Sequence, residues 1–115
     1  MRESLRDPQR LQHMQEAIDK LLSSNSNHAF THLKATDLEY FGVVKLLEII
    51  GEAAYKITLQ FKVSHPETPW KYIVGMRHIL VHGYYQVNKA DVIKTIEEDL
   101  PVLRDQIARY LTEFE

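Results

Sequence analysis

The sequence predicts an all-α protein, an up-and-down bundle of four to five helices in which residues 1–115 form a single domain. Apolar residues recur at helical spacing along most of the chain, and strict alternation does not dominate. Helix-start and helix-stop signals divide this pattern into separate segments. A length of 115 residues is close to the common domain size and is sufficient for one hydrophobic core.

The first helix is predicted to begin at Asp7, a good N-cap residue, with Pro8 at the first helical position, where its missing N–H costs least. The apolar side of this helix consists of Leu11, Met14, Ile18, Leu21 and Leu22. The turn-forming residues 23–27 (SSNSN) should end it.

The second helix is predicted to start at a capping box, residues 36–39 (TDLE), and to run to about Phe61. Apolar residues surround almost its whole circumference, so it should be central or covered on a second side by a partner. The remaining polar strip consists of Lys45, Glu48, Glu52 and Lys56. We expect solvent to cover this strip, with Glu52 pairing with Lys56; a carboxylate of the strip that faces a cleft and orients Arg77 is the less favoured alternative.

The third helix should follow the connector 65–69 (HPETP), with Thr68 as N-cap and Pro69 at the first position. Trp70 is expected to be a core or interface anchor, because a large aromatic ring at a helix start is usually buried. Gly83 should end this helix as the residue that favours the left-handed C′ conformation.

Asn88 is predicted to cap a fourth helix. Its apolar side consists of Val92, Ile96, Leu100, Leu103, Ile107 and Leu111. Pro101 must kink this helix or begin a fifth one. The acidic run 97–99 (EED) should face solvent.

Composition restricts the functional classes. The formal net charge is −2, which argues against a protein that coats nucleic acid nonspecifically but permits an enzyme with one small basic site. The chain has no cysteine, which excludes disulfides, thiol catalysis and cysteine metal sites. With no signal-peptide core at its start and no long apolar stretch, the protein is expected to be cytoplasmic.

The most informative stretch is 75–85 (GMRHILVHGYY), which contains Arg77, His78, His82, Tyr84 and Tyr85. In a straight helix Arg77 and His82 lie roughly 140° apart. They can meet only if the helix ends or distorts near His82, or if two chains bring them together.

An imidazole beside a guanidinium suits RNA cleavage without a metal. The histidine would move the proton of an attacking 2′-hydroxyl, and the arginine would stabilise charge on the phosphoryl oxygens. From the pattern alone, capping of free helix carbonyls is the commoner role for such residues. The pairs His78-x3-His82 and His28-x3-His32 have zinc-ligand spacing, but they lack an evident third ligand, and we expect no metal.

The arrangement Arg77-x4-His82-x-Tyr84 resembles the R-x(4–6)-H motif of HEPN domains, in the R-x4-H-x-Y form of the HepT-like toxins. Three further segments look like that family, so that the resemblance covers most of the chain: 51–54 (GEAA), 65–70 (HPETPW) and 99–107 (DLPVLRDQI).

This resemblance implies an all-α homodimer with two motifs facing each other across a cleft, and a metal-independent endoribonuclease toxin without a cofactor. Arg77 and His82 would be the catalytic pair, with His78 as a possible auxiliary residue. A cognate MNT-type nucleotidyltransferase antitoxin would neutralise the toxin by transferring AMP from ATP to Tyr84. Tyr85 lies outside the motif and is interpreted as a packing residue.

Two other functions are compatible with the same residues. The chain could be a noncatalytic nucleotide-binding or acceptor subunit of a nucleotidyltransferase complex, because Tyr84 would serve that role equally well. It could also be a bundle whose polar helix end has only a structural role.

Overall fold

The computed structural model describes residues 4–83 and 87–115 of the chain. Helices occur throughout these ranges and no strand occurs in them, which confirms the predicted all-α bundle. The four long helices are α1 (Asp7–Ser24), α2 (Leu38–Lys56), α4 (Trp70–His82) and α6 (Leu100–Thr112). The shorter elements are α3 (Leu59–Ser64), α5 (Lys89–Lys94), the 3-10 segments η1 (Ser4–Arg6) and η2 (Ser26–His32), and the π-helical turn η4 (Thr95–Asp99).

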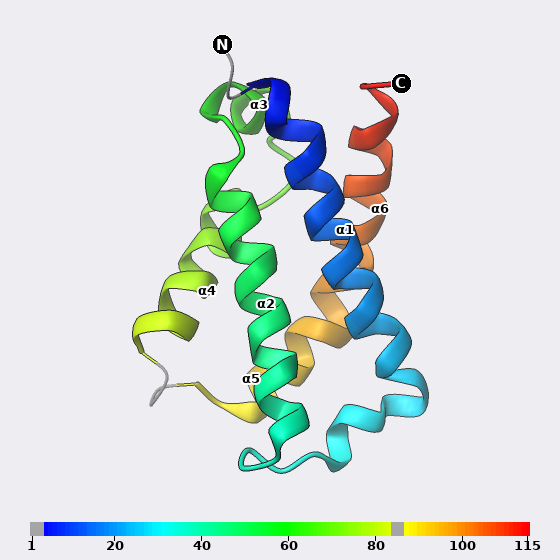
Figure 1. The fold of residues 1–115 in the computed structure, drawn as a ribbon, viewed down its shortest axis with the longest axis vertical. Helices are drawn as coiled ribbons and strands as arrows, with labels where there is room; N and C mark the ends of the chain where they lie inside the picture. The colour runs from blue at the N-terminus through cyan, green and yellow to red at the C-terminus, as the bar shows by residue number, and fades with distance from the viewer. Residues whose placement is uncertain (1–3, 84–86) are drawn as a thin grey trace.

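Helix α2 is central, as its apolar sequence predicts. It packs against α1 on one side and α4 on the other, and α1 also packs against α6 (Figure 1). The apolar side chains with no exposed surface come from α1, α2, η4 and α6: Leu11, Met14, Ile18, Leu21, Ile50, Ala54, Ile96 and Ile107. Burial of such side chains is the main term that stabilises a bundle of this size.

Helix α4 is the least embedded of the long helices. It packs on α2, while a groove of about 910 Å³ lies between it and the segment formed by α5, η4 and α6. Large apolar side chains of α2 and α4 remain exposed, with Tyr72 and Ile79 on the wall of this groove: Leu38, Phe41, Ile49, Tyr55, Tyr72, Ile79 and Val81. The described part of the chain therefore leaves one apolar side of α2 exposed to solvent. No helix in that part is long and apolar enough to span a membrane.

The start of α1 differs from the prediction. Arg6 occupies the N-cap position, Pro8 lies in the first turn, and Asp7 does not cap its own helix. Instead the buried Asp7 carboxylate accepts hydrogen bonds from the backbone N–H of Thr58, at 3.0 Å, and from its hydroxyl, at 2.7 Å. The Thr58 oxygen in turn accepts a bond from the N–H of Phe61 and so caps α3. Asp7, which resembles a helix cap in the sequence, thus joins two segments that are distant along the chain.

The second helix begins within the predicted segment 36–39 but without the capping box, and its predicted end is wrong. Helix α2 begins at Leu38 without a side-chain cap, because Asp37 accepts a bond from the N–H of Lys34 and closes the preceding turn. The helix ends at Lys56 and does not reach Phe61. Ile57 and Thr58 are extended, with ψ of 140° and 149°, and the tie to Asp7 holds the chain in this break before α3.

Thr68 does not cap α4, contrary to prediction. It is buried, and its hydroxyl donates to Oε1 of Gln106 at 2.7 Å and lies 2.6 Å from the Tyr110 hydroxyl. Tyr110 donates to the Glu67 carboxylate at 2.8 Å. Burial, reinforced by that carboxylate, raises the pKa of Tyr110 to about 12, so its hydroxyl remains a neutral donor. The connector before α4 is thus fastened to α6, and Pro69 takes the N-cap position without a side-chain bond.

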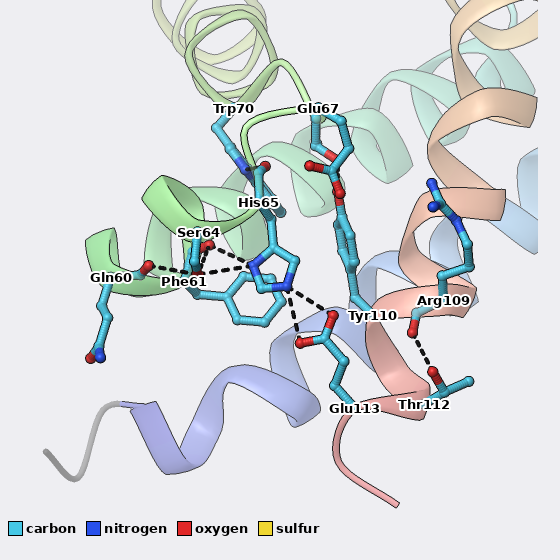
Figure 2. A network of polar contacts seen from close by, with 11 residues as sticks. Gln60, Phe61, Ser64, His65, Glu67, Trp70, Arg109, Tyr110, Thr112 and Glu113 are labelled. Atoms are coloured by element: carbon cyan, nitrogen blue, oxygen red, sulfur yellow. Dashed lines mark hydrogen bonds and ion pairs between the residues drawn. The ribbon is translucent and has the colours of Figure 1, made fainter.

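His65 is the centre of a second polar cluster at the same end of the bundle (Figure 2). Its Nδ1 lies 2.8 Å from the carbonyl oxygen of Phe61, and its Nε2 lies 2.8 Å from the Glu113 carboxylate. The imidazole stacks on the Phe61 ring at 3.8 Å, and the buried Trp70 indole donates to the His65 carbonyl. Because both ring nitrogens face acceptors, the protonated imidazole fits this position best. Sequence analysis placed His65 only in a turn.

This cluster makes stability depend on pH. Burial lowers the pKa of His65, but the Phe61 carbonyl, the bonded Glu113 carboxylate and the charge of Glu67 together outweigh it, so the pKa is raised. The stabilisation is therefore complete below the unfolded-state value of about 6.5 and is lost as pH rises through the folded-state pKa. We expect the melting temperature to fall more steeply above pH 6.5 in the wild type than in His65→Gln. Thermal denaturation at several pH values measures this, with exposed His32→Gln as control. Parallel profiles for the wild type and His65→Gln would contradict it.

The remaining boundaries follow the sequence closely. Helix α4 ends at His82 before Gly83, although the φ of Gly83 is −120° and not left-handed. Asn88 caps α5 by accepting a bond from the N–H of Ala90 at 2.7 Å, as predicted. Pro101 lies in the first turn of α6, which continues α5 through the π-helical turn η4 without a non-helical residue, so the helical segment is distorted just before the proline, as the kink alternative predicts.

The acidic run before α6 was only partly interpreted correctly. Glu98 and Asp99 are exposed, as predicted. Glu97 instead contacts Asn25, at 3.1 Å, and Nδ1 of His28, at 2.7 Å, and so anchors the segment around η2.

Candidate active site at the crossing of α2 and α4

Gly51 determines how closely α4 packs on α2. A Cβ atom at Gly51 would lie 2.2 Å from Cβ of Arg77, closer than real Cβ atoms approach other atoms, and a tight 3.2 Å from its Cα. The missing side chain of Gly51 therefore permits the crossing and fixes where the side chain of Arg77 leaves α4. The cluster 51–54 (GEAA) thus has a packing reason for its glycine.

The next residue, Glu52, contacts Arg77 directly. Oε2 of Glu52 lies 2.7 Å from Nε of Arg77, so the less favoured alternative, in which Glu52 orients this arginine, is the correct one. Nε is buried yet makes no hydrogen bond of acceptable geometry with any described residue, because its N–H does not point along the line to Oε2. We therefore treat the contact as a close ion pair, not an aligned hydrogen bond. Oε1 of Glu52 lies 3.6 Å from Nζ of Lys56.

Tyr55 completes the surroundings of Arg77. The guanidinium carbon lies 5.5 Å from the centroid of the Tyr55 ring, within the range of a cation–π contact. The side chain of Arg77 is 27% exposed, so a fixed positive charge remains accessible at the surface. Sequence reasoning missed Tyr55; the spacing of Glu52 and Tyr55 on one side of α2 was its only signal.

The two histidines of the motif lie further along α4. His78 and His82 are exposed, and their ring centroids are 4.8 Å apart with a tilt of 52°. Helix α4 is regular up to His82, so Arg77 and His82 remain on different faces, and no recorded contact between described residues joins them. Tyr84, the predicted AMP acceptor, and Tyr85 lie outside the described residues.

The two histidine pairs considered for zinc differ in their surroundings. His28 pairs with Glu97, and His78 packs beside His82. No group of three or more His, Cys, Asp or Glu residues that could hold a metal occurs in residues 4–83 and 87–115.

The comparisons of this chain with known proteins agree on one family. The profile of the family described as "Ribonuclease HepT-like" matches residues 14–110. "Probable ribonuclease HepT" of Thermococcus cleftensis is 34% identical over 99 residues, which are 86% of this chain and 90% of that protein. "Putative RNase TTE0752" of Caldanaerobacter subterraneus subsp. tengcongensis is 32% identical over 101 residues, 88% of this chain and 90% of that protein. No solved structure gives a significant match. The chain therefore belongs to the HepT-like ribonuclease family.

Proposed function

We propose that this protein is the toxin of a HepT/MNT-type toxin–antitoxin system and acts as a metal-independent endoribonuclease. The observation that carries the proposal is the fixed, partly exposed guanidinium of Arg77 on the helix that also presents His78 and His82. These residues form the motif, and the chain belongs to a ribonuclease family. Arg77 and His82 are the catalytic pair of this proposal, and His78 assists.

In the proposed reaction the RNA 2′-hydroxyl attacks the adjacent phosphorus. His82 accepts the hydroxyl proton as the O2′–P bond forms, and the P–O5′ bond breaks. The guanidinium of Arg77 stabilises charge on the non-bridging oxygens, and Glu52 and Tyr55 keep it in place. A proton returns to O5′ from the protonated imidazole, so the products carry a 2′,3′-cyclic phosphate and a 5′-hydroxyl. No step requires a metal ion.

We also propose that the active form is a homodimer. In a regular α4, one chain holds Arg77 and His82 on different faces, so a cleft between two copies is the arrangement in which both could reach one phosphate. The uncovered apolar side chains on α2 and α4 support a second copy, since monomers rarely expose so many together. Symmetry would then place two copies of the motif opposite each other.

The nuclease is tested with purified, unmodified protein, single-stranded RNA and an excess of EDTA. We expect cleavage in the presence of EDTA and cyclic-phosphate ends on the products, detected by mass spectrometry. Cleavage that disappears with EDTA and returns with added Mg²⁺ would reject the metal-free mechanism. Absence of cleavage under both conditions would reject the nuclease and favour the noncatalytic acceptor subunit.

We further propose that an MNT-type nucleotidyltransferase neutralises the toxin. It would transfer AMP from ATP to the Tyr84 hydroxyl and release pyrophosphate. The position of Tyr84, two residues beyond His82, supports this, because a bulky charged group there would lie next to the proposed catalytic residue. The partner would be the product of a neighbouring gene.

Intact-mass measurement after co-expression with that nucleotidyltransferase tests the modification. We expect AMP-sized additions on the wild type and on Tyr85→Phe, and none on Tyr84→Phe. Modified protein should lose RNase activity. Additions that persist in Tyr84→Phe would move the acceptor to another residue and contradict the assignment.

A further inference from the structure

A shallow hollow of about 290 Å³ lies between α1 and α2, separate from the groove behind α4. Its walls come from the beginning of α1 and the second half of α2. They consist of Arg6, Gln9, Arg10, His13, Ile49, Glu52, Ala53 and Lys56. Of these residues the proposed chemistry uses only Glu52, which holds Arg77 in place.

The hollow is strongly cationic for a chain of net charge −2. Among the described residues, Arg6, Arg10 and Lys56 line it together with His13, and Glu52 is the one carboxylate in this part of the lining. A guanidinium N–H of Arg10 donates to the carbonyl oxygen of Lys56, which holds this charge at the end of α2. Positive charges gathered in a concave surface attract anions more strongly than the same charges spread over a convex one.

Glu52 connects the hollow to the candidate active site. Its carboxylate lines the hollow and contacts both Arg77, at 2.7 Å, and Lys56, at 3.6 Å. Two cations therefore compensate this one negative charge. Helix α2 lies between α1 and α4 (Figure 1). An RNA strand that crosses α2 beside Glu52 would therefore pass from Arg77 into the hollow.

We propose that this hollow binds backbone phosphates of the RNA that flank the phosphate held at Arg77. The inference rests on the proposed nuclease function and adds a path for the substrate. Lys56 and Arg10 are the principal contacts, with Arg6 and His13 at the outer edge. RNA is favoured over a protein partner because, of the described residues that line the hollow, two are apolar, Ile49 and Ala53, whereas protein-binding sites usually have an apolar centre.

The test measures binding of a fluorescein-labelled 2′-O-methyl RNA oligonucleotide, which lacks the attacking hydroxyl and cannot be cleaved. Fluorescence anisotropy at several salt concentrations gives Kd and its salt dependence. We expect Lys56→Gln to raise Kd about threefold and Arg10→Gln/Lys56→Gln about tenfold. Each lost phosphate contact should reduce the slope of log K against log salt by about 0.7, the value for single strands.

Matched controls remove one positive charge elsewhere: Lys20→Gln in α1 and Arg104→Gln in α6, both exposed. Lys56→Arg should restore wild-type binding, because it keeps the charge. Melting temperatures show whether Arg10→Gln disturbs the fold. If it does, Lys56→Gln alone decides, since its side chain has one exposed ion pair.

Each outcome has a definite meaning. A Kd and salt slope for the double variant equal to those of the two controls overturn the proposal. If RNA binding is unchanged but a nucleotidyltransferase partner no longer binds, the hollow belongs to a protein interface and the proposal is also overturned. If the double variant binds more weakly as expected while the wild type cleaves no natural RNA, the hollow stands and the nuclease function fails.

Discussion

Arg77→Ala is expected to slow RNA cleavage by about 10²–10³-fold, the usual effect of removing one preorganised donor to a developing negative charge. The structure suggests why the loss should be large. Gly51, Glu52 and Tyr55 position this guanidinium before substrate binds, so little reorganisation is needed in the transition state. Single-turnover cleavage rates with saturating protein measure the effect on the chemical step.

Two variants sharpen this prediction. Arg77→Lys keeps the charge but loses the planar fork that can hold two phosphoryl oxygens, and should recover only a small part of the rate. Arg104→Ala, which removes an exposed arginine from α6, should cleave at the wild-type rate. Equal rates for Arg77→Ala, His82→Ala and the wild type would remove both residues from the catalytic mechanism.

Gly51→Ala is expected to destabilise the protein by about 1–3 kcal/mol, the typical cost of overpacking a tight interface. The added Cβ would meet Cβ and Cα of Arg77, so the backbone of α4 would have to move away from α2. The same movement would displace Arg77, and cleavage should fall at a temperature where the variant is still folded. Urea denaturation and single-turnover rates measure the two effects.

The other helical glycines provide controls of opposite sign. A Cβ atom added at Gly42 or at Gly75 meets nothing within 4 Å, and both residues lie inside helices and are exposed. Gly42→Ala and Gly75→Ala should therefore stabilise the protein by about 0.5–1 kcal/mol through helix propensity. If all three substitutions change stability in the same direction, the close approach at Gly51 does not control the packing of α4.

Helical periodicity predicted the architecture because it depends on residues within a few turns of each other. The apolar residues assigned to α1 and to the last two helices are buried as expected, apart from the partly buried Leu22 and Leu111, and Asn88 caps α5. The capping roles of Asp7 and Thr68 were wrong for a shared reason. Each side chain satisfies a partner that is distant in sequence, Thr58 for Asp7 and Gln106 for Thr68. Rules for local capping cannot anticipate this competition.

In the candidate site too, local sequence signals were predictable and contacts between distant residues were not. The motif identified Arg77 and His82 from sequence alone, together with the conclusion that a regular helix keeps them apart. The charge pattern favoured a solvated role for Glu52, because spacing along α2 does not reveal which helix lies opposite. Only the crossing at Gly51 makes Glu52 and Tyr55 neighbours of Arg77.

Helix α4 is attached differently at its two ends, so its last turn can move further than its first. Its first turn follows a connector bonded to α6 through Thr68, Gln106 and Tyr110, whereas its later turns rest on α2 and border an open groove. Any rocking of this helix pivots near Trp70, and its amplitude grows along the roughly 18 Å to His82. Arg77, which packs against Gly51, would move less than His82. Rocking leaves the distance between Arg77 and His82 of one helix unchanged, but in the proposed dimer it would change the distance from His82 to the motif of the second copy, and a molecule that binds the free end of α4 would set that distance.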